Sequence, residues 1–386
     1  MADWNSLKEQ ISRQARQAGF DLCGVAPAGH FAELEYFPRW IAEGRHGEMN
    51  YLAARTADQR LKRESLANVA PWARSVVVSA INYDSPYPYS TECSDPSLGW
   101  ISRYAWAETD YHDTVLERLR TLESSLTALA TPERVPGTPQ PLRTWCYVDT
   151  GPVVERVLAR YAGIGWVGKN TCVINQQLGS WIFLGVLLTS LPLPPDLPAP
   201  DRCGSCTRCL DACPTGALPL PYQMDASRCI AYLTIEKRGS IPTGLRAGIG
   251  RNIFGCDICQ DVCPWNRRAA SAGDNSGKPS AELASTAIAE LTPRKHFVNP
   301  ELRRLAAMSE EEFRSTFRHS PVNRAKYEGL MRNVIVAMGN SGDPSFIPEL
   351  EALAHSGNSV LTEHAQWSLG ILRSAQKPAT QVVRKV

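Results

Sequence analysis

The sequence predicts an α+β protein of several domains, with a mixed α/β N-terminal half, a cysteine-rich middle segment and a helical C-terminal part. Its 386 residues suffice for two or three domains. Three observations support the prediction. Helix-periodic segments alternate with β-branched runs before residue 195, eight cysteines gather between residues 203 and 263, and two similar helical segments recur after residue 330.

The N-terminal half, residues 1–195, is expected to form one domain. Apolar residues at helical spacing predict helices at 4–18, 31–44 and 110–129. Short apolar runs predict strands at 21–26, 74–80, 144–148, 171–174 and 181–189, with the last two joined by a turn. Pro152 suits a first helical turn, so a further helix is expected from there to Ala162.

Cysteines in the middle segment follow the spacing of bacterial ferredoxins. The first run is Cys203-x-x-Cys206-x-x-Cys209-x-x-x-Cys213-Pro214. In such a run three close thiolates hold one cubane and the fourth reaches a second cubane. The second run, Cys256-x-x-Cys259-x-x-x-Cys263-Pro264, has one cysteine fewer, and Cys229 between the runs can supply the missing ligand.

The eight thiolates therefore match two [4Fe–4S] clusters in a ferredoxin-like domain over residues 196–270. One cluster is assigned to Cys203, Cys206, Cys209 and Cys263. The other is assigned to Cys213, Cys229, Cys256 and Cys259. The alternative is structural zinc on the Cys-x-x-Cys pairs, which would have no use for a third cysteine at the same interval or for the prolines that follow.

The C-terminal part, residues 285–386, is expected to be helical. It follows a segment rich in Gly, Ser and Asn at 271–278, which indicates a linker. The segments 333–339 and 364–370 align 31 residues apart, and a helix is expected between them at 344–354. This pattern is typical of short HEAT-type helical repeats. Two units are too few for an independent solenoid, so they are expected to pack on the rest of the protein.

Composition narrows the class of protein. Hydrophobic residues make up 43% of the chain, but no run of about 18 apolar residues occurs, so no membrane span is expected. The N-terminal residues do not resemble a signal peptide. Twelve cysteines without an export signal indicate the reducing cytoplasm and metal binding rather than disulfides. The four cysteines outside the clusters are expected to be small buried apolar residues: Cys23, Cys93, Cys146 and Cys172.

Basic residues gather in and near the cysteine-rich segment, although the net charge is only +2. They include Lys237, Arg238, Arg246, Arg251 and Arg267–Arg268. Such groups beside a redox centre could steer a polyanion to it, or they could form an ordinary solvated surface. Charge alone leaves both interpretations open.

Two motifs have a structural and a functional interpretation. Gly163-Ile-Gly-Trp-Val-Gly-Lys169 partly matches a dinucleotide fingerprint, but it follows a predicted helix, whereas the fingerprint must follow a strand. A glycine-rich loop that approaches another large cofactor is favoured. Asp149-Thr-Gly-Pro152 has the composition of a helix cap, which is the default interpretation of Asp149 from residue types alone.

Several motifs together resemble the epoxyqueuosine reductase family. They lie in the family's order over nearly the whole chain, and they are Arg103-Tyr-Ala-Trp106, Asp110-Tyr-His112, Asp149-Thr-Gly-Pro-x-x-Glu-Arg156, Gly165-Trp-Val-Gly-Lys-Asn-Thr171, Gly179-Ser-Trp181, Cys263-Pro-Trp-Asn266 and Gly339-Asn-Ser-Gly-Asp343. The resemblance implies a cobalamin-dependent iron–sulfur oxidoreductase with an α/β cobalamin-binding module. The family performs the last step of queuosine synthesis by reducing the epoxide of the modified base at the wobble position of tRNA. The related group is the reductive dehalogenases.

The resemblance also implies roles for individual residues. Asp149 matches the family's proton donor, which would protonate the epoxide oxygen as the C–O bond breaks. The expected cobalamin contacts are Arg63, Arg103, Tyr104, Asp149, Asn170, Val173, Leu184, Ala231, Cys256 and Asp257. Some cobalamin enzymes bind cobalt through Asp-x-His-x-x-Gly. Here Val115 replaces the glycine, so His112 is expected to be a polar group near a helix start.

The implied partners are a tRNA that carries epoxyqueuosine and a ferredoxin or flavodoxin that donates electrons. The cluster bound by Cys213, Cys229, Cys256 and Cys259 is expected to lie nearer the cobalamin. Contacts to tRNA are expected from Lys237, Arg238, Arg251 and Arg332, and the protein is expected to be a cytoplasmic monomer. The alternatives are a reductive dehalogenase of small molecules and a non-catalytic electron-transfer or cobalamin-carrying protein, and lack of a tRNA-binding surface would favour these two.

Overall fold

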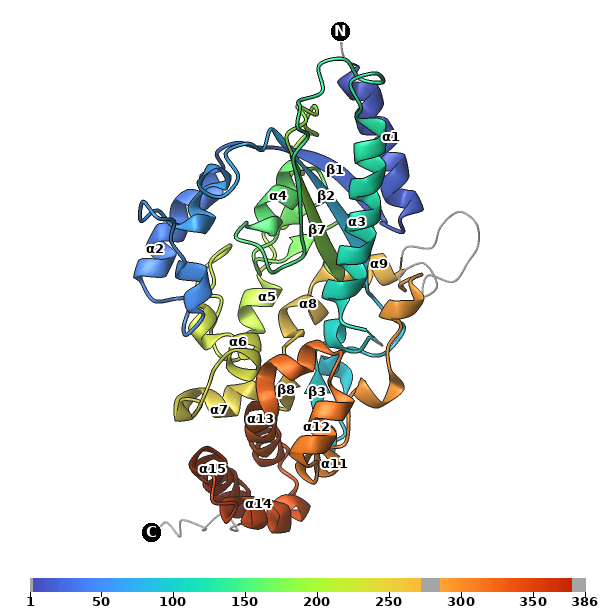
Figure 1. Cartoon of the computed structure of the whole chain (residues 1–386). Coiled ribbons are helices and arrows are strands. Elements are labelled where there is room, and N and C mark those ends of the chain that lie inside the picture. The colour runs from blue at the N-terminus through green and yellow to red at the C-terminus, as the bar shows by residue number, and fades with distance from the viewer. Residues whose placement is uncertain (1–2, 108, 272–284, 377–386) are drawn as a thin grey trace. The chain divides into compact units, whose positions relative to one another are not determined.

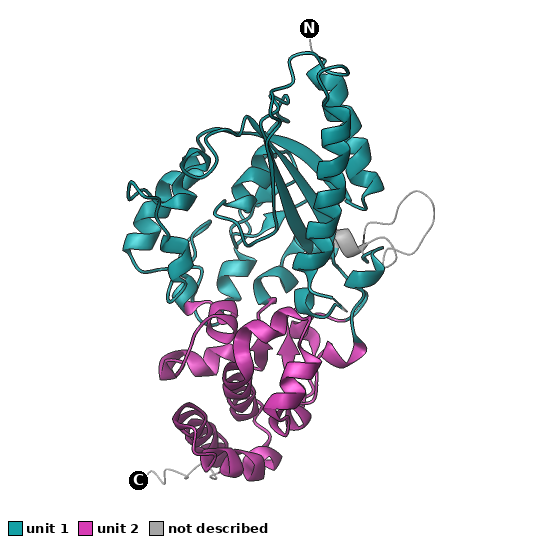
Figure 2. Cartoon of the chain, viewed as in Figure 1, with its two compact units in different colours: residues 1–87, 103–227, 258–294 teal, residues 88–102, 228–257, 295–386 magenta. Residues whose placement is uncertain are grey.

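The chain divides into two compact units (Figure 2). The computed structural model describes residues 3–107, 109–271 and 285–376. Unit 1 comprises residues 1–87, 103–227 and 258–294, and unit 2 comprises residues 88–102, 228–257 and 295–386. Apart from Ser271, the predicted linker lies outside the described residues.

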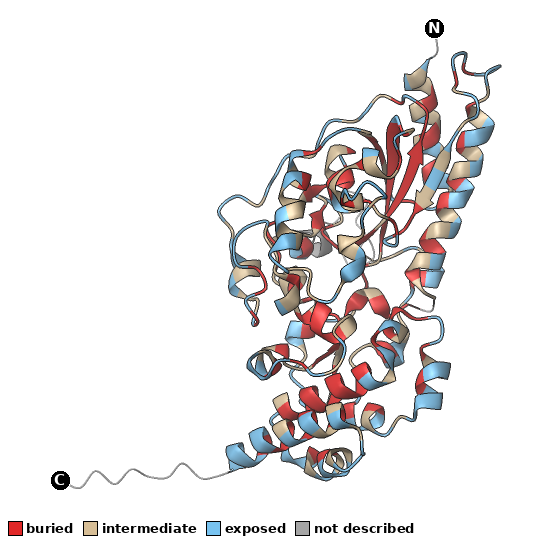
Figure 3. Cartoon of the chain, turned by 60° about the vertical axis from the view of Figure 1, so that its left-hand side comes forward, coloured by how far each residue is buried: buried red, intermediate tan, exposed pale blue. Residues whose placement is uncertain are grey.

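A four-stranded antiparallel sheet organises unit 1 (Figure 1). The strands lie in the order β1 (Leu22–Pro27), β2 (Ser75–Asn82), β7 (Ile182–Thr189) and β4 (Thr144–Tyr147), and every neighbouring pair is antiparallel. The two central strands, β2 and β7, are buried almost throughout because helices lie over both faces (Figure 3). The prediction of a mixed α+β fold is confirmed.

Unit 1 contains the helices α1 (Trp4–Gln17), α2 (Phe37–Ala42), α3 (Tyr111–Leu129), α4 (Glu155–Tyr161), α5 (Arg208–Asp211), α8 (Ile258–Asp261) and α9 (Pro264–Ser271). Three of them pack on this sheet: α1 and α3 lie against one face and α4 lies against the other. Val77 and Ile81 of β2 pack with α1 and α3, whereas Val76 and Val78 pack with α4. Successive side chains of a strand point to opposite faces, and this alternation gives the sheet two apolar sides.

Three sequence-based boundaries in unit 1 were wrong. The helix expected from Pro152 begins only at Glu155, after the N-cap residue Val154. The helix expected over 31–44 is split into a short 3-10 helix and α2. The strand expected over 171–174 comprises only β6 (Val173–Ile174), which pairs with β5 (Trp166–Val167).

The glycines at 163–168 serve this small hairpin. Gly163 follows α4 with φ of +72°. A Cβ on Gly165 would lie 2.4 Å from the carbonyl oxygen of Ile174, and a Cβ on Gly168 would lie 2.5 Å from the Ile174 side chain. Close packing of the hairpin therefore explains the glycines, and the approach of a cofactor is not needed to account for them.

Unit 2 contains a parallel pair of short strands and most of the C-terminal helices. The strands are β3 (Trp100–Ile101) and β8 (Asn252–Phe254). The helices are α6 (Ile230–Ile235), α7 (Thr243–Ile249), α11 (Leu302–Ala306), α12 (Glu310–Thr316), α13 (Lys326–Asn340), α14 (Ile347–Ala354) and α15 (Ser359–Gln376). None of the helices within the described residues is long and apolar enough to cross a membrane.

Short 3-10 helices connect these elements in both units. They occupy Ala32–Tyr36, Asn50–Ala53, Lys62–Glu64, Leu66–Asn68, Ser90–Glu92, Arg103–Ala105, Ala226–Arg228, Ala289–Leu291, Lys295–Phe297, Pro321–Ala325 and Pro344–Phe346.

The two aligned C-terminal segments lie on α13 and α15, which pack closely together. Ser368 of α15 donates a hydrogen bond to the carbonyl oxygen of Ile335, 2.8 Å away. A Cβ on Gly339 would lie 2.9 Å from the Cα of Ser368, so a larger residue there would separate the helices. Asn333 donates to the carbonyl oxygens of Thr234 and Ile253, which ties α13 to the segment around α6 and β8.

Protonation of His364 is expected to destabilise unit 2 in acid. This side chain is buried, and the Ile241 amide donates a hydrogen bond to its Nε2, 3.1 Å away. Burial lowers the pKa of His364 to about 4. An unfolded histidine titrates near pH 6.5, so below that pH the unfolded chain binds more protons. The free energy of unfolding should therefore fall by about 1.4 kcal/mol per pH unit between pH 6.5 and 4.

Urea denaturation of the parent and of His364→Gln between pH 4 and 7 would measure this effect. Carboxylates titrate in both proteins, so their contribution cancels in the difference. The variant should lose less stability than the parent over that interval, whereas parallel losses would contradict the assignment to His364.

Candidate active site

Asp149 lies in the loop between β4 and α4, in an uncommon backbone conformation. Its φ of +56° is left-handed, which aspartate tolerates better than most residues. Gly151 allows the loop to turn over Tyr147, because a Cβ on Gly151 would lie 2.2 Å from the tyrosine ring. Since α4 begins after Val154 without a side-chain cap, the interpretation of Asp149 as a helix cap was wrong.

Arg63 anchors the same loop. Its Nη2 donates to the carbonyl oxygen of Gly151 at 2.9 Å, and its Nη1 donates to that of Tyr51 at 2.7 Å. The guanidinium also lies over the Tyr51 ring. Arg63 therefore connects the loop that carries Asp149 to a segment nearly a hundred residues earlier.

Tyr111 and His112, at the start of α3, lie beside the Asp149 carboxylate. The Tyr111 hydroxyl donates a hydrogen bond to Asp149 Oδ2 at 2.9 Å. His112 Nε2 lies 3.9 Å from the same oxygen, and His112 Nδ1 lies 2.7 Å from Asp110 Oδ1. The Asp149 side chain is 69% exposed. An acid that is held by a neighbour and still open on one side can approach a bound substrate.

Tyr111 is fixed as a hydrogen-bond donor. Burial, and then the charge of Asp149, raise the pKa of Tyr111 well above its usual value. The phenol therefore keeps its proton at neutral pH and orients the Asp149 carboxylate.

Glu155, at the first turn of α4, is a second acid near Asp149. Its Oε1 is buried and has no hydrogen-bond partner among the described residues. Burial, and then the negative charge of Asp149, raise the pKa of Glu155 to about 7. This carboxyl group is therefore partly protonated near neutral pH.

The first predicted cluster set lies together in unit 1. Cys203, Cys206, Cys209 and Cys263 line a cavity of about 170 Å³. Burial, and then the neighbouring thiols of Cys263 and Cys203, raise the pKa of Cys209 to about 11. Without a metal such crowded thiols keep their protons, and binding of iron would displace them. Four thiols around one cavity match the four thiolate ligands of a cubane.

Lys169 and Trp166 support the loop that carries these cysteines. Lys169 Nζ donates to the carbonyl oxygens of Gly204 and Cys206, at 2.6 and 3.0 Å. Trp166 Nε1 donates to the sulfur of Cys203 at 3.5 Å. The glycine-rich hairpin thus positions the cysteine loop.

The second predicted set is shared between the units. Cys213 and Cys259 belong to unit 1, and Cys229 and Cys256 belong to unit 2. The sulfur of Cys213 accepts a hydrogen bond from the Ala217 amide at 3.3 Å, and Cys229 precedes the first residue of α6. The four-cysteine assignment stays a prediction.

No disulfide joins any of the twelve cysteines, all of which lie within the described residues. Among those residues, no three His, Cys, Asp or Glu side chains converge on a point where one ion could bind. In a cubane each thiolate binds a different iron, so its four sulfurs need not converge on one point.

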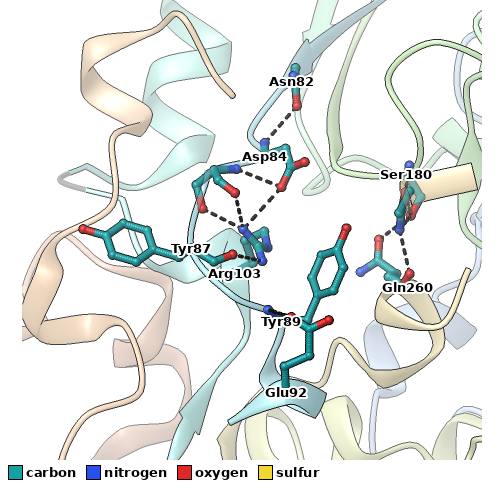
Figure 4. Close-up of polar contacts among 10 residues, drawn as sticks. Asn82, Asp84, Tyr87, Tyr89, Glu92, Arg103, Ser180 and Gln260 are labelled. Carbon is teal, nitrogen blue, oxygen red and sulfur yellow. Dashed lines mark hydrogen bonds and ion pairs between the residues drawn. The ribbon is translucent and has the colours of Figure 1, made fainter. Parts of the chain in front are cut away.

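Arg103, a predicted cobalamin contact, is buried in a network of unit 1 (Figure 4). Its Nη1 lies 3.3 Å from Asp84 Oδ1 and donates to the carbonyl oxygen of Ser85 at 2.8 Å. Its Nη2 donates to the carbonyl oxygen of Tyr87 at 3.0 Å. This placement indicates that Arg103 orders the backbone between Ser85 and Tyr87.

The other predicted cobalamin contacts differ in burial. Tyr104 is half-buried and packs edge-on against Tyr111, whose ring stacks on Phe183 with centroids 4.2 Å apart. Asn170 is buried and donates to the carbonyl oxygen of Cys259 at 3.3 Å. In unit 1, Val173 is buried in β6 and Leu184 is half-buried in β7. In unit 2, Ala231 and Cys256 are half-buried and Asp257 is buried.

The predicted tRNA contacts all belong to unit 2, where Arg332 is buried. Its guanidinium donates to the carbonyl oxygens of Leu233, Lys237 and Gly239, at 2.7, 2.9 and 2.6 Å. Arg332 therefore supports the backbone of the 237–239 segment from within.

The remaining three predicted contacts are at least partly accessible. Arg238 is exposed and donates to the carbonyl oxygen of Arg324 at 2.9 Å. Lys237 is half-buried. Arg251 is also half-buried, and it donates to the carbonyl oxygen of Leu98 at 3.0 Å while its guanidinium lies over the Trp100 ring.

Sequence analysis did not assign a role to Tyr111 or Glu155. Both lie inside motifs shared with the family, Asp110-Tyr-His112 and Asp149-Thr-Gly-Pro-x-x-Glu-Arg156. Their presence in these motifs was the sequence feature that could have indicated a functional role. Their proximity to Asp149 depends on how α3 and α4 pack on the sheet.

Comparison with known proteins first defines the class. The model of a 4Fe-4S double cluster binding domain matches residues 202–266. The chain is therefore an iron–sulfur protein with a double-cluster domain over the predicted cysteine-rich segment.

The family follows from matches over nearly the whole chain. A model described as epoxyqueuosine reductase QueG, DUF1730, matches residues 63–150. The epoxyqueuosine reductase of Pseudomonas aeruginosa is 39% identical over 372 residues, which cover 94% of this chain and 94% of that protein. The epoxyqueuosine reductase of Escherichia coli is 34% identical over 369 residues, which cover 95% of this chain and 90% of that protein. This chain belongs to the epoxyqueuosine reductase family, which is a family of oxidoreductases.

The fold agrees with solved structures of that family. One of them is an epoxyqueuosine reductase crystallised with an epoxyqueuosine-modified tRNA-Tyr stem loop. Its match to this chain has a TM-score of 0.78 and 32% sequence identity, and it covers 98% of this chain and 96% of that chain. A catabolic reductive dehalogenase is more distant, with a TM-score of 0.43 and 17% identity.

Proposed function

We propose that this enzyme reduces epoxyqueuosine in tRNA to queuosine, with electrons that pass through [4Fe–4S] clusters to a bound cobalamin. The observation that supports it most directly is the Asp149 carboxylate, which is open on one side and held by Tyr111. Removing the epoxide oxygen as water needs two electrons and two protons. An oriented acid at the reacting oxygen supplies a proton as the C–O bond breaks.

Asp149 is the proton donor in this proposal. Its proton passes to the epoxide oxygen while the C–O bond breaks, so that no free alkoxide forms. The Tyr111 hydroxyl keeps Oδ2 in place, and Arg63 keeps the loop in place through Gly151. Neither residue needs to touch the substrate to fulfil this role.

The family to which the chain belongs supports cobalamin as the cofactor. Beside Asp149, whose side chain is exposed, the half-buried Tyr104 ring packs edge-on against Tyr111. When bound, cobalamin supplies a cobalt centre that can gather single electrons for a two-electron reduction. We assign its contacts to Arg63, Tyr104, Asn170, Val173 and Leu184 of unit 1 and to Ala231, Cys256 and Asp257 of unit 2. Arg103 would act by ordering the backbone between Ser85 and Tyr87.

The cluster on Cys203, Cys206, Cys209 and Cys263 is proposed to receive the electrons. Arg202 and Arg208 line the same cavity as these cysteines. Positive charge at that position would attract an acidic one-electron donor such as a ferredoxin or flavodoxin. The cluster on Cys213, Cys229, Cys256 and Cys259 would pass the electrons on, and the protein would act as a cytoplasmic monomer.

The proposed substrate is a tRNA whose anticodon loop presents the modified base. Bases in RNA loops can be splayed out into a protein pocket, and a related reductase was crystallised with such a stem loop. Lys237, Arg238 and Arg251 are proposed to contact phosphates. Arg332 would contribute by holding the Lys237 and Gly239 carbonyl groups, and the HEAT-like helices α13 to α15 would grip the stem.

The function can be tested with purified protein incubated without oxygen with cobalamin, a strong reductant and tRNA that carries epoxyqueuosine. Mass spectrometry of the digested nucleosides should show epoxyqueuosine replaced by queuosine. Omission of the reductant is the control. A protein that leaves the epoxide intact but dehalogenates a halogenated phenol under the same conditions would establish the alternative activity instead.

Charge reversal at Lys237 is expected to weaken tRNA binding without changing cofactor content. Neutralising phosphates releases counterions, so the logarithm of the affinity falls linearly with the logarithm of salt concentration. Lys237→Glu should lower the affinity at low salt. It should also reduce the magnitude of this slope by about 1, because about one counterion fewer is released on binding. Filter binding at several salt concentrations measures both quantities.

Arg314→Glu is the matched control. The Arg314 side chain is 73% exposed in the same unit, and it forms an ion pair with Glu310, four residues earlier on the same helix. The double variant Lys237→Glu with Arg238→Glu should enlarge the effect. Parent-like binding of that double variant at every salt concentration would remove this segment from the tRNA-binding surface.

A further inference from the structure

The proposed reaction needs more protons than Asp149 can carry. Conversion of an epoxide to an alkene and water consumes two electrons and two protons. A single carboxyl group holds one proton, so it must be recharged either within a turnover or between turnovers. The recharging group must reach Asp149 and must also exchange protons with water.

His112 meets both conditions. Its Nε2 lies 3.9 Å from Asp149 Oδ2, a distance that a side-chain rotation or one water molecule can bridge. Its side chain is 32% exposed, which gives it access to solvent. Imidazole also has two ring nitrogens that can take up and release a proton.

The orientation of the His112 ring is fixed from two sides. Asp110 Oδ1 lies 2.7 Å from Nδ1, which holds a proton on that nitrogen and directs Nε2 toward Asp149. The Tyr111 ring stacks on the imidazole with centroids 4.0 Å apart and an interplanar angle of 30°. Asp110 also accepts a hydrogen bond from the His112 amide at 3.0 Å, so this arrangement is part of the start of α3.

We propose that His112 returns a proton to Asp149, and that Asp110 and Tyr111 position it for this step. The Nε2–H bond of the imidazolium breaks and an Oδ2–H bond forms on Asp149, which leaves a neutral imidazole. A proton from the bulk solvent then restores the imidazolium, and no electron moves in either step. This inference rests on the proposed function and adds a proton path to it.

Other charged groups surround Asp149, and they are less suited to the task. Tyr111 keeps its proton because its pKa is raised well above its usual value. Arg63 is held by two carbonyl oxygens, and a guanidinium does not release its proton. Glu155 has a suitable pKa of about 7, but its Oε1 is buried and has no hydrogen-bond partner among the described residues. Glu155 is therefore the competing candidate in the experiment.

The test compares the parent, His112→Ala and Glu155→Gln in anaerobic turnover of epoxyqueuosine-tRNA, with and without added imidazole. His112→Ala should slow turnover by about a hundredfold, at the lower end of the range for general acid–base catalysis. Added imidazole should restore a large part of the rate, and more at pH 6 than at pH 8, because imidazolium is the proton source. Iron content, cobalamin absorbance and tRNA affinity should remain at parent values.

Rescue by a small diffusible acid distinguishes a proton path from a structural role. A slow variant that imidazole does not restore at any pH would overturn the proposal, as would a His112→Ala variant with parent-like turnover. Loss of turnover in Glu155→Gln with full rescue by imidazole would assign the path to Glu155 instead. If the parent itself produces no queuosine, the proposed function fails and the proton path fails with it.

Discussion

Asp149→Asn is expected to retain clusters and cobalamin and to lose about two orders of magnitude or more of turnover, as is typical when a general acid is removed. Asparagine has nearly the same shape, tolerates the left-handed φ of +56°, and can still accept the hydrogen bond from Tyr111. It has no acidic proton to give to the epoxide oxygen. The loss should therefore appear in the chemical step.

Single-turnover conversion of epoxyqueuosine-tRNA, followed by nucleoside mass spectrometry, would measure that step. Asp113→Asn is the matched control, because Asp113 is an exposed aspartate on α3, close in sequence to His112. The control should behave as the parent does. Turnover of Asp149→Asn within a few-fold of the parent would remove Asp149 from the chemistry.

Cysteine replacement is expected to divide the iron content in half. The parent purified without oxygen should contain about eight irons per chain, as two cubanes require. Cys206→Ala and Cys229→Ala should each retain about four irons, since each variant loses one ligand of a different cluster. Both variants should lose electron delivery and hence turnover, even where tRNA still binds.

The two cysteine variants should differ in spectroscopy. Because each retains a different cluster, their reduced electron paramagnetic resonance spectra should be distinct, and together they should account for the parent spectrum. Cys93→Ala, which lies outside both predicted sets, is the control and should keep all its iron. Retention of both clusters in Cys229→Ala would show that Cys229 is not a ligand, and stoichiometric zinc in place of iron would revive the zinc alternative.

The sequence alone determined the features that depend on local spacing. Cysteine intervals predicted the double-cluster segment because ligands of one cluster must lie within a few residues of one another, and the matched family model agrees. Apolar periodicity located α1, α3, β2 and β7, because helix and strand repeats are local properties of the chain. The motif around Asp149 identified an acid without showing its surroundings.

Only the tertiary structure decided what lies next to Asp149 and how residues with the same charge are used. Tyr111 and Asp149 are 38 positions apart, and they meet because α3 packs on the sheet that ends at β4. Among the predicted tRNA contacts, Arg238 is exposed whereas Arg332 is buried with its donors turned to backbone carbonyls. Burial and electrostatic environment arise from contacts between distant segments of the chain. A local sequence pattern therefore could not distinguish these two arginines, and it could not predict that the pKa of Glu155 is raised to about 7.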